Sequence, residues 1–261
     1  MEDSKKFYLL GTDNVFPRTA NKVLKAILKT KGVPDENIIQ EYTPFHHQDY
    51  QTIVGKIKAF AASGDACVLS TINGDSNVPF YKEFANQGLT SEDCPIMAFS
   101  VSEDELRAMD VPPLVGHLAA WNYFQSIKTK ENIQFVRTFK TYCKEKGLPG
   151  GSKRVTCDPI EAAYFGVYVW AAACEKAGTF DVDKVRNAVY GMEFDSPGGK
   201  KKMHPDNQHT LKPVYVGEIL KNGQFKIVYK SDGLVSPDSY SSYLHPDGNY
   251  PAPTGGPKKK I

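Results

Sequence analysis

The chain has 261 residues, of which 41% are hydrophobic and 24% are charged, a composition typical of a globular protein and unlike that of disordered or membrane-embedded chains. Its 32 basic and 30 acidic side chains leave a formal charge of +2, too small for the broad positive field that nucleic-acid binding requires. Apolar stretches such as residues 164–173 are shorter than the ~20 residues that cross a bilayer. The sequence therefore predicts neither a nucleic-acid partner nor a membrane span.

The first half of the chain alternates short apolar runs with stretches of helical periodicity. The runs that predict strands are residues 6–11, 38–43, 66–72 and 96–101, and the stretches that predict helices are residues 18–31, 50–62 and 78–85. Strands that alternate with helices indicate a parallel sheet of right-handed βαβ units, and so an α/β fold. A fifth apolar run, residues 115–121, fits either a further strand or a segment that leads out of the sheet.

The second half predicts a different pattern. Residues 130–146 and 158–176 have helical periodicity, and Asp158 is expected to cap the second of these helices, with a proline at its first position. Asp181 is expected to cap a shorter helix that ends near residue 190. The Asn222-Gly223 turn then predicts a β-hairpin, and the Pro-, Gly- and Ser-rich residues 231–261 predict a tail that is extended over the surface or disordered.

Polar loops follow three of the predicted strands, where ligands collect in open α/β sheets. They begin at Thr12, Asn73 and Ser100 and offer carboxylate, amide and hydroxyl groups suited to a small neutral ligand with several N–H donors. The candidate ligand-binding residues are Asp13, Asn14, Phe16, Asn73, Asp75 and Ser100. Residues of these types also precede helices simply to cap them, and Ser102 with Glu105 is expected to form a capping box rather than a site.

Catalytic and metal-binding signatures do not emerge from the sequence. It contains no G-x-S-x-G, H-E-x-x-H or P-loop motif, so we expect no enzyme activity and no cofactor. Adjacent His46 and His47 cannot easily share one metal ion, which argues against a metal site there. Five cysteines without CxxC spacing favour free thiols in a reducing compartment, and the first six residues lack the pattern of a secretory signal, so either there is none or the chain starts downstream of one.

Several longer motifs carry a family resemblance. The segment Thr12-Asp13-Asn14-Val15-Phe16-Pro17-Arg18-Thr19-Ala20-Asn21 resembles the strand-to-helix signature of urea- and short-chain-amide-binding proteins of ABC transporters, in the type I periplasmic-binding-protein family. Similar motifs follow in the same order, namely Ile72-Asn73-Gly74-Asp75-Ser76-Asn77, Gly116-His117-Leu118-Ala119-Ala120-Trp121 and His209-Thr210-Leu211-Lys212-Pro213-Val214-Tyr215. The match runs from residue 6 to about residue 244 and begins in the middle of the family's pattern.

The resemblance implies a type I periplasmic-binding-protein-like α/β fold of which only part is present. Residues 1–125 would form a second-lobe-like parallel unit, residues 126–230 would supply helices and a hairpin that return toward an incomplete first lobe, and residues 231–261 would form the tail. This sequence departs from the family's pattern at two places that bear on function. Asn14 stands where these receptors commonly carry tyrosine, and Lys200-Lys201-Lys202 replaces a more apolar strand, which predicts a solvated or partner-facing edge.

These features predict a non-enzymatic binding protein for a small neutral amide such as urea, acting in uptake or sensing. An alternative is a degenerate receptor domain that serves as a structural subunit of a ciliary or cytoskeletal assembly, and a third is a fragment of a receptor or cyclase ectodomain. We also expect another protein chain to cover the incomplete lobe, because residues 159–176 carry more apolar surface than one sheet face can bury. The resemblance implies a periplasmic or extracellular location, whereas the cysteines and the first residues favour an intracellular one.

Overall fold

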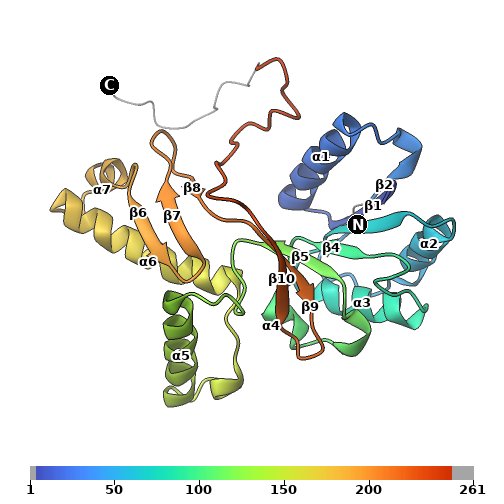
Figure 1. The fold of residues 1–261 in the computed structure, drawn as a ribbon, viewed down its shortest axis with the longest axis horizontal. Coiled ribbons are helices and arrows are strands. Elements are labelled where there is room, and N and C mark those ends of the chain that lie inside the picture. The colour runs from blue at the N-terminus through green and yellow to red at the C-terminus, as the bar shows by residue number, and fades with distance from the viewer. Residues whose placement is uncertain (1–3, 249–261) are drawn as a thin grey trace.

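The computed structural model describes residues 4–248, which form two bodies joined by a few crossing segments (Figure 1). One body is a twisted seven-stranded sheet with helices on both faces, and the other holds three helices and a small three-stranded sheet. The α/β class and the mostly parallel sheet expected from the sequence are confirmed. No helix within residues 4–248 is both long enough and apolar enough to span a membrane.

The large sheet has the order β10-β9-β5-β4-β3-β1-β2. Its parallel strands are β1 (Lys6–Thr12), β2 (Ile38–Thr43), β3 (Ala66–Thr71), β4 (Ile96–Ala98) and β5 (Leu118–Trp121). The fifth apolar run is therefore a strand of this sheet, since Leu118 pairs in parallel with Met97. The hairpin β9 (Tyr215–Ile219) and β10 (Phe225–Lys230) is antiparallel to β5 and adds to the same sheet, so it does not lie with the helices that precede it in the sequence.

The helices cover the sheet on opposite faces because neighbouring strand residues point in opposite directions. Leu9 of β1 packs in the cluster beneath α1 (Val15–Thr30), whereas Leu10 belongs to the larger cluster on the other face, which includes residues of α2 (Gln51–Ala61) and α3 (Asn77–Asn86). All six residues of β3, which lies between β4 and β1, are buried. The short helix α4 (Glu103–Leu106) follows β4 and starts at a capping box of Ser102 and Glu105, as predicted.

The second body is built from the segment between β5 and β9. Its elements are α5 (Lys130–Glu145), α6 (Asp158–Ala177), α7 (Val182–Ala188), β6 (Glu193–Ser196), β7 (Gly199–Met203) and β8 (Thr210–Leu211), with sheet order β6-β7-β8. Asp181 caps α7 as predicted, accepting a hydrogen bond from the Lys184 N–H at 3.0 Å. The remaining short elements are the 3₁₀ turns η1 (Asp35–Asn37), η2 (Gly74–Ser76), η3 (Pro112–Leu114) and η4 (Gly151–Lys153).

Two sequence predictions about this body are wrong. Asp158 is not the cap of α6, since Cys157 occupies that position and the Asp158 carboxylate accepts a hydrogen bond from the distant Asn122 N–H at 3.0 Å. The lysine-rich strand β7 is the middle strand of its sheet rather than an exposed edge. Its alternation sends Lys201 inward to a buried ion pair, whereas its two lysine neighbours face solvent.

The tail and the cysteines complete the described chain. Residues 231–248 form no regular element and are tied back through an isolated bridge between Lys212 and Val235. The three lysines near the C-terminus, residues 258–260, lie outside the described residues. All five cysteines are buried and free, and burial raises the pKa of the Cys67 thiol to about 11.

Candidate functional site

The carboxyl ends of β1, β2, β3 and β4 open at one edge of the large sheet, and the loops that follow them are hydrogen-bonded to one another. The Asp13 N–H donates to the Thr43 carbonyl at 2.6 Å, which joins the ends of β1 and β2. The Asn73 N–H donates to the Thr12 hydroxyl at 2.9 Å and so joins the loops after β1 and β3. These bonds fix the loops as one surface, which we call the polar wall.

The loop after β4 joins the same surface through Ser100, whose hydroxyl donates to the carbonyl of Ile72. Asn77, which is buried, also donates to that carbonyl at 2.9 Å and to the Gly74 carbonyl at 3.1 Å. The loop after β3 is therefore held by the side chain of Ser100, from the loop after β4, and by that of Asn77, at the start of α3. Asn73 and Asp75 are left at its surface, partly exposed and exposed respectively.

The two carboxylates at the polar wall, Asp13 and Asp75, each have a basic side chain beside them. The Arg18 guanidinium binds both oxygens of Asp13, at 2.5 and 2.9 Å, and lies 4.7 Å from the centre of the Tyr42 ring. His46 places Nδ1 2.9 Å from a carboxylate oxygen of Asp75. These partners hold the pKa of both carboxyl groups below the usual value.

The six predicted residues do not all play the same part. Asp13, Asn73 and Ser100 belong directly to the network, and Asp75 joins it through His46. Asn14 serves as the cap of α1, because its side-chain oxygen accepts the Val15 N–H at 2.6 Å. Phe16, in the first turn of α1, is 42% exposed and makes no ring contact among the described residues.

Sequence reasoning missed Arg18 and the role of His46. The spacing of Asp13 and Arg18 across the start of a helix could have suggested their pairing. By contrast, nothing local connects His46 with Asp75, which lies 29 positions away. His46 and His47 do not converge on a metal position, since His47 instead places Nε2 2.7 Å from the Asp49 carbonyl oxygen.

The crossing from β5 into the second body is braced by two buried carboxyl groups. Asp158 accepts the Asn122 N–H, and Glu103 accepts the Gln125 N–H at 2.6 Å. The Asn122 amide also donates to the Pro213 carbonyl at 2.8 Å, which ties this crossing to the returning one. Burial raises the pKa of Glu103 to about 8. The brace fixes the backbone between the two bodies.

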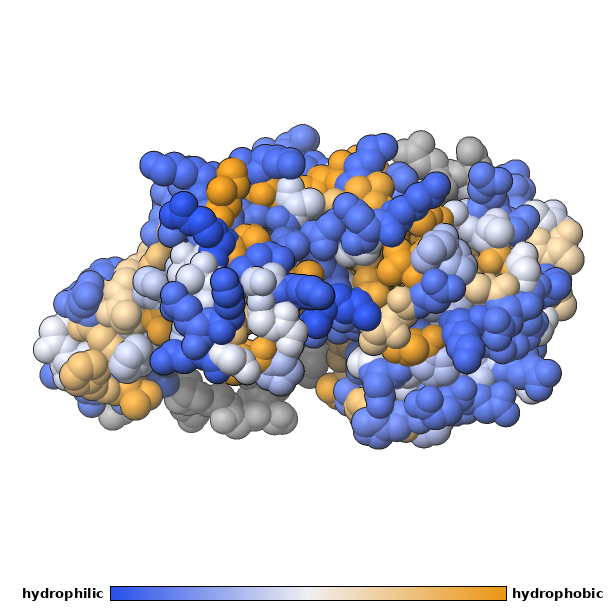
Figure 2. Space-filling view, turned by 90° about the horizontal axis from the view of Figure 1, so that it is seen from below, coloured by the Kyte–Doolittle hydropathy of each residue, from blue (hydrophilic) through white to orange (hydrophobic). Residues whose placement is uncertain are grey.

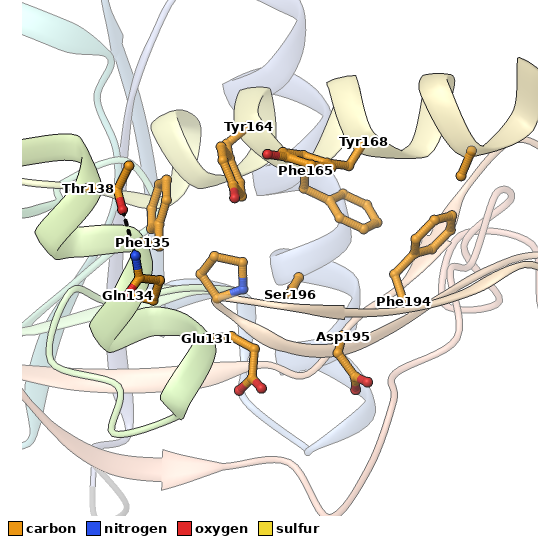
Figure 3. A pocket seen from close by; sticks show the side chains of 12 residues that line it. Glu131, Gln134, Phe135, Thr138, Tyr164, Phe165, Tyr168, Phe194, Asp195 and Ser196 are labelled. Atoms are coloured by element: carbon orange, nitrogen blue, oxygen red, sulfur yellow. Dashed lines mark hydrogen bonds between the residues drawn. The ribbon is translucent and has the colours of Figure 1, made fainter. Parts of the chain in front are cut away.

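A cavity of about 420 Å³ lies apart from the polar wall, in the second body. It is lined by residues of α5, α6 and β6, and five of the twelve lining residues are aromatic (Figure 3). None of the six residues predicted from the sequence lines it. The polar wall and this apolar cavity are thus separate features of the structure.

Comparison with known proteins shows what this architecture resembles. A Leu/Ile/Val-binding protein homolog of Brucella melitensis is 28% identical over 183 residues, which cover 68% of this chain but 44% of the relative. The solved structure of an ABC-transporter solute-binding protein from Rhodopseudomonas palustris, in complex with p-hydroxybenzoic acid, matches with a TM-score of 0.75 at 22% identity, over 88% of this chain and 61% of that one. The amino acid ABC transporter substrate-binding protein of Pseudomonas fluorescens matches with the same TM-score at 17% identity, over 91% and 61%.

The chain thus spans less than half of the curated relative and about three fifths of the solved structures. The solved structures share the fold of this chain, and at these sequence identities the similarity shows the fold alone. A family model for a periplasmic binding protein domain matches residues 1–246, nearly the whole described chain. The topology, the polar edge of the sheet and this match agree, and the chain belongs to the periplasmic binding protein domain family.

Proposed function

We propose that the chain supplies one wall of a solute-binding site and that its ligand is a small neutral molecule with N–H donors, such as urea or a short amide. The observation that carries this proposal is the polar wall, on which loops from four neighbouring strands are hydrogen-bonded together. Because hydrogen bonds already fix these polar groups, they can orient a ligand with little further loss of side-chain or loop entropy on binding.

The charge of the wall favours a neutral ligand. Arg18 and His46 are both occupied by acidic partners, so neither is left to bind a carboxylate. An anionic ligand would also meet the negative charges of Asp13 and Asp75. A neutral amide can instead donate its N–H groups to these carboxylates and accept a hydrogen bond from the Asn73 side chain.

The relatives widen the range of ligands to be tested. The name of the Brucella protein refers to branched-chain amino acids, and the Rhodopseudomonas protein was solved with a hydroxybenzoate. Two exposed rings near the wall, Phe16 and Phe45, offer apolar faces to a planar ligand. Leucine and benzoate are therefore the appropriate competitors of urea in an experiment.

Isothermal titration of this chain, and of any longer product of its gene, with urea, formamide, acetamide, leucine and benzoate tests the proposal. We expect saturable heat with an amide, lost in Asp75→Ala and retained in Asp35→Ala. The control is matched, because the two aspartates are 61% and 62% exposed and each is paired with a basic side chain. Saturable binding of benzoate or leucine in preference to every amide would overturn the choice of ligand, and no heat with any of them would overturn the binding function.

A further inference from the structure

A second cavity lies on the body that contains the large sheet, between α3 and the segment that follows α4. Its volume is about 450 Å³, within the range of about 300–1,000 Å³ that small-molecule sites occupy. Residues of α3 and residues from the segment 108–114 line it. Figure 2 looks from below at the end of the molecule that holds α3, and it shows apolar surface there among hydrophilic groups. We call this space the α3 cavity.

The lining of the α3 cavity is mainly apolar and carries no net charge. Its aliphatic and sulfur-containing members are Val78, Ala85, Ala108, Met109, Pro113 and Leu114. The two charged residues that line it, Lys82 and Asp110, are both exposed and of opposite sign. An uncharged ligand with an apolar body therefore fits this lining better than an ion does.

Tyr81 adds a polar group that lacks a partner. The residue lines the cavity and is 1% exposed, and its hydroxyl makes no hydrogen bond within residues 4–248. Its ring packs 5.4 Å from Phe80 and 5.9 Å from His117, centre to centre. A buried hydroxyl of this kind is unfavourable, because it gives up its hydrogen bonds to water and gains none in return. A ligand oxygen that accepts a hydrogen bond from it would remove that penalty.

Met109 can make room for such a ligand. It is half-buried, and it packs against the core cluster that includes Tyr81 and Leu114. The hydroxyl of Tyr81 is closed to water, so a ligand reaches it only when a neighbouring side chain moves. Among the apolar lining residues, methionine has the most rotatable bonds, and it adapts to irregular space at low cost.

We propose that the α3 cavity binds a small uncharged molecule with an apolar body and one oxygen that accepts a hydrogen bond from the Tyr81 hydroxyl, such as an aromatic ketone. The site is separate from the polar wall, because none of the six residues predicted from the sequence lines it. Binding there needs no amide at the wall, so the inference goes beyond the proposed function and does not rest on it.

The test titrates the intact chain with three probes of similar shape. Acetophenone has the acceptor oxygen, isopropylbenzene lacks it, and benzoate carries a charge. Isotope-labelled methionine methyl groups, observed by NMR, report where a probe binds, because Met109 alone of the described methionines lines the cavity. The signal of Met109 is assigned with the variant Met109→Leu.

Two matched pairs of variants accompany the titration. Tyr81→Phe removes the unpartnered hydroxyl, and its control is Tyr215→Phe, since Tyr215 is 3% exposed and its hydroxyl already donates to the Gly198 carbonyl at 3.0 Å. Ala108→Trp fills the cavity, and its control is Ala59→Trp on α2, because both alanines are exposed and Ala59 does not line the cavity.

We expect acetophenone to shift the Met109 methyl signal saturably, and isopropylbenzene to do so more weakly. Tyr81→Phe should weaken acetophenone binding about two- to tenfold, the loss of one neutral hydrogen bond, and change isopropylbenzene binding by less than about twofold. Tyr215→Phe and Ala59→Trp should leave both probes unaffected, whereas Ala108→Trp should abolish the binding of both.

Four results would overturn the proposal. The absence of a saturable Met109 shift with acetophenone would remove the site, as would binding that survives Ala108→Trp. Equal weakening of both uncharged probes by Tyr81→Phe would show that the hydroxyl does not contact the ligand, and tighter binding of benzoate at Met109 would show that the cavity selects an anion. Analytical ultracentrifugation is the last measurement, because a dimer that Ala108→Trp dissolves would identify a second copy as the occupant.

Discussion

Lys201 and Glu161 form an ion pair inside the second body. The lysine Nζ lies 2.6 and 2.5 Å from the two carboxylate oxygens, and the two side chains are 0% and 1% exposed. The ammonium also lies 4.3 Å from the centre of the Phe165 ring, and the Gly198 N–H donates to the same carboxylate. The pair ties β7 to α6 and so holds the small sheet against the aromatic helix.

Replacing one member of this pair should be costly. Lys201→Met leaves a buried carboxylate without its cation, and we expect a loss of about 3–5 kcal/mol in the free energy of unfolding. The exposed neighbour Lys200 is the control, and Lys200→Met should change stability by less than about 0.5 kcal/mol. Urea denaturation followed by circular dichroism measures both. The double variant Lys201→Met/Glu161→Leu should recover most of the loss, and a double variant no more stable than the single one would contradict this account.

Glu103 should make stability depend on pH. Burial raises its pKa in the folded chain to about 8, above the value of about 4.5 in the unfolded chain, so its ionisation opposes folding. The group is neutral in both states below pH 4.5, and stability falls as the pH rises from there through 8. Relative to the native chain, Glu103→Gln should therefore gain stability between pH 5 and pH 8.5, by an amount on the order of a few kcal/mol.

Urea denaturation of the native chain and of Glu103→Gln, each at pH 5 and at pH 8.5, checks this expectation. The relevant quantity is the difference between variant and native chain, because other groups titrate in the same range. His117, for example, is buried with its pKa lowered to about 4, so its contribution to stability is lost as the pH falls below 6.5. An equal difference at pH 5 and pH 8.5 would show that Glu103 is ionised in the folded protein throughout.

Replacing Gly11 or Gly55 by alanine should change the stability of the chain in opposite directions. A Cβ on Gly11, in β1, would lie 2.8 Å from the Pro17 Cβ and also crowd the Thr71 hydroxyl, so Gly11→Ala should cost about 1–3 kcal/mol. A Cβ on Gly55, inside α2, would meet nothing closer than a Gln87 side-chain oxygen at 3.9 Å. Because alanine favours helix, Gly55→Ala should stabilise the chain by about 0.5–1 kcal/mol. Thermal unfolding of the two variants should shift the transition in opposite directions, and a shift of the same sign would contradict the packing described.

The ion pair of Asp13 and Arg18 should determine whether the polar wall prefers neutral or anionic ligands. Asp13→Asn removes the charge that balances Arg18, so affinity for benzoate should rise about two- to fivefold at low salt and the gain should shrink as salt is added. Asp35→Asn, at a surface pair before the start of β2 and so at the opposite end of that strand from the wall, should have no such effect. Titration calorimetry with benzoate and urea at two salt concentrations measures the change. A gain in urea affinity with none for benzoate would show that Arg18 does not face the ligand.

Local patterns in the sequence were sufficient for most of the elements. Strand and helix periodicities predicted β1 to β4 and α1 to α3, the capping box at Ser102 was present, and the Asn222-Gly223 turn predicted the hairpin β9–β10. These features depend on residues a few positions apart, which is why they could be predicted. The sequence could not show whether residues 115–121 form a strand, because only their pairing with β4 distinguishes a strand from a linker.

The sequence by itself determined the parallel α/β unit and the set of polar loops after the strands, since periodicity, capping and turn chemistry act over short distances. The resemblance of its longer motifs indicated the family. Only the tertiary structure decided which of those polar groups meet. His46 reaches Asp75 across 29 positions and Lys201 reaches Glu161 across 40. Whether a charged side chain is solvated or buried in a pair depends on what packs above its strand. For β7 that is helix α6, and no pattern within the strand specifies it.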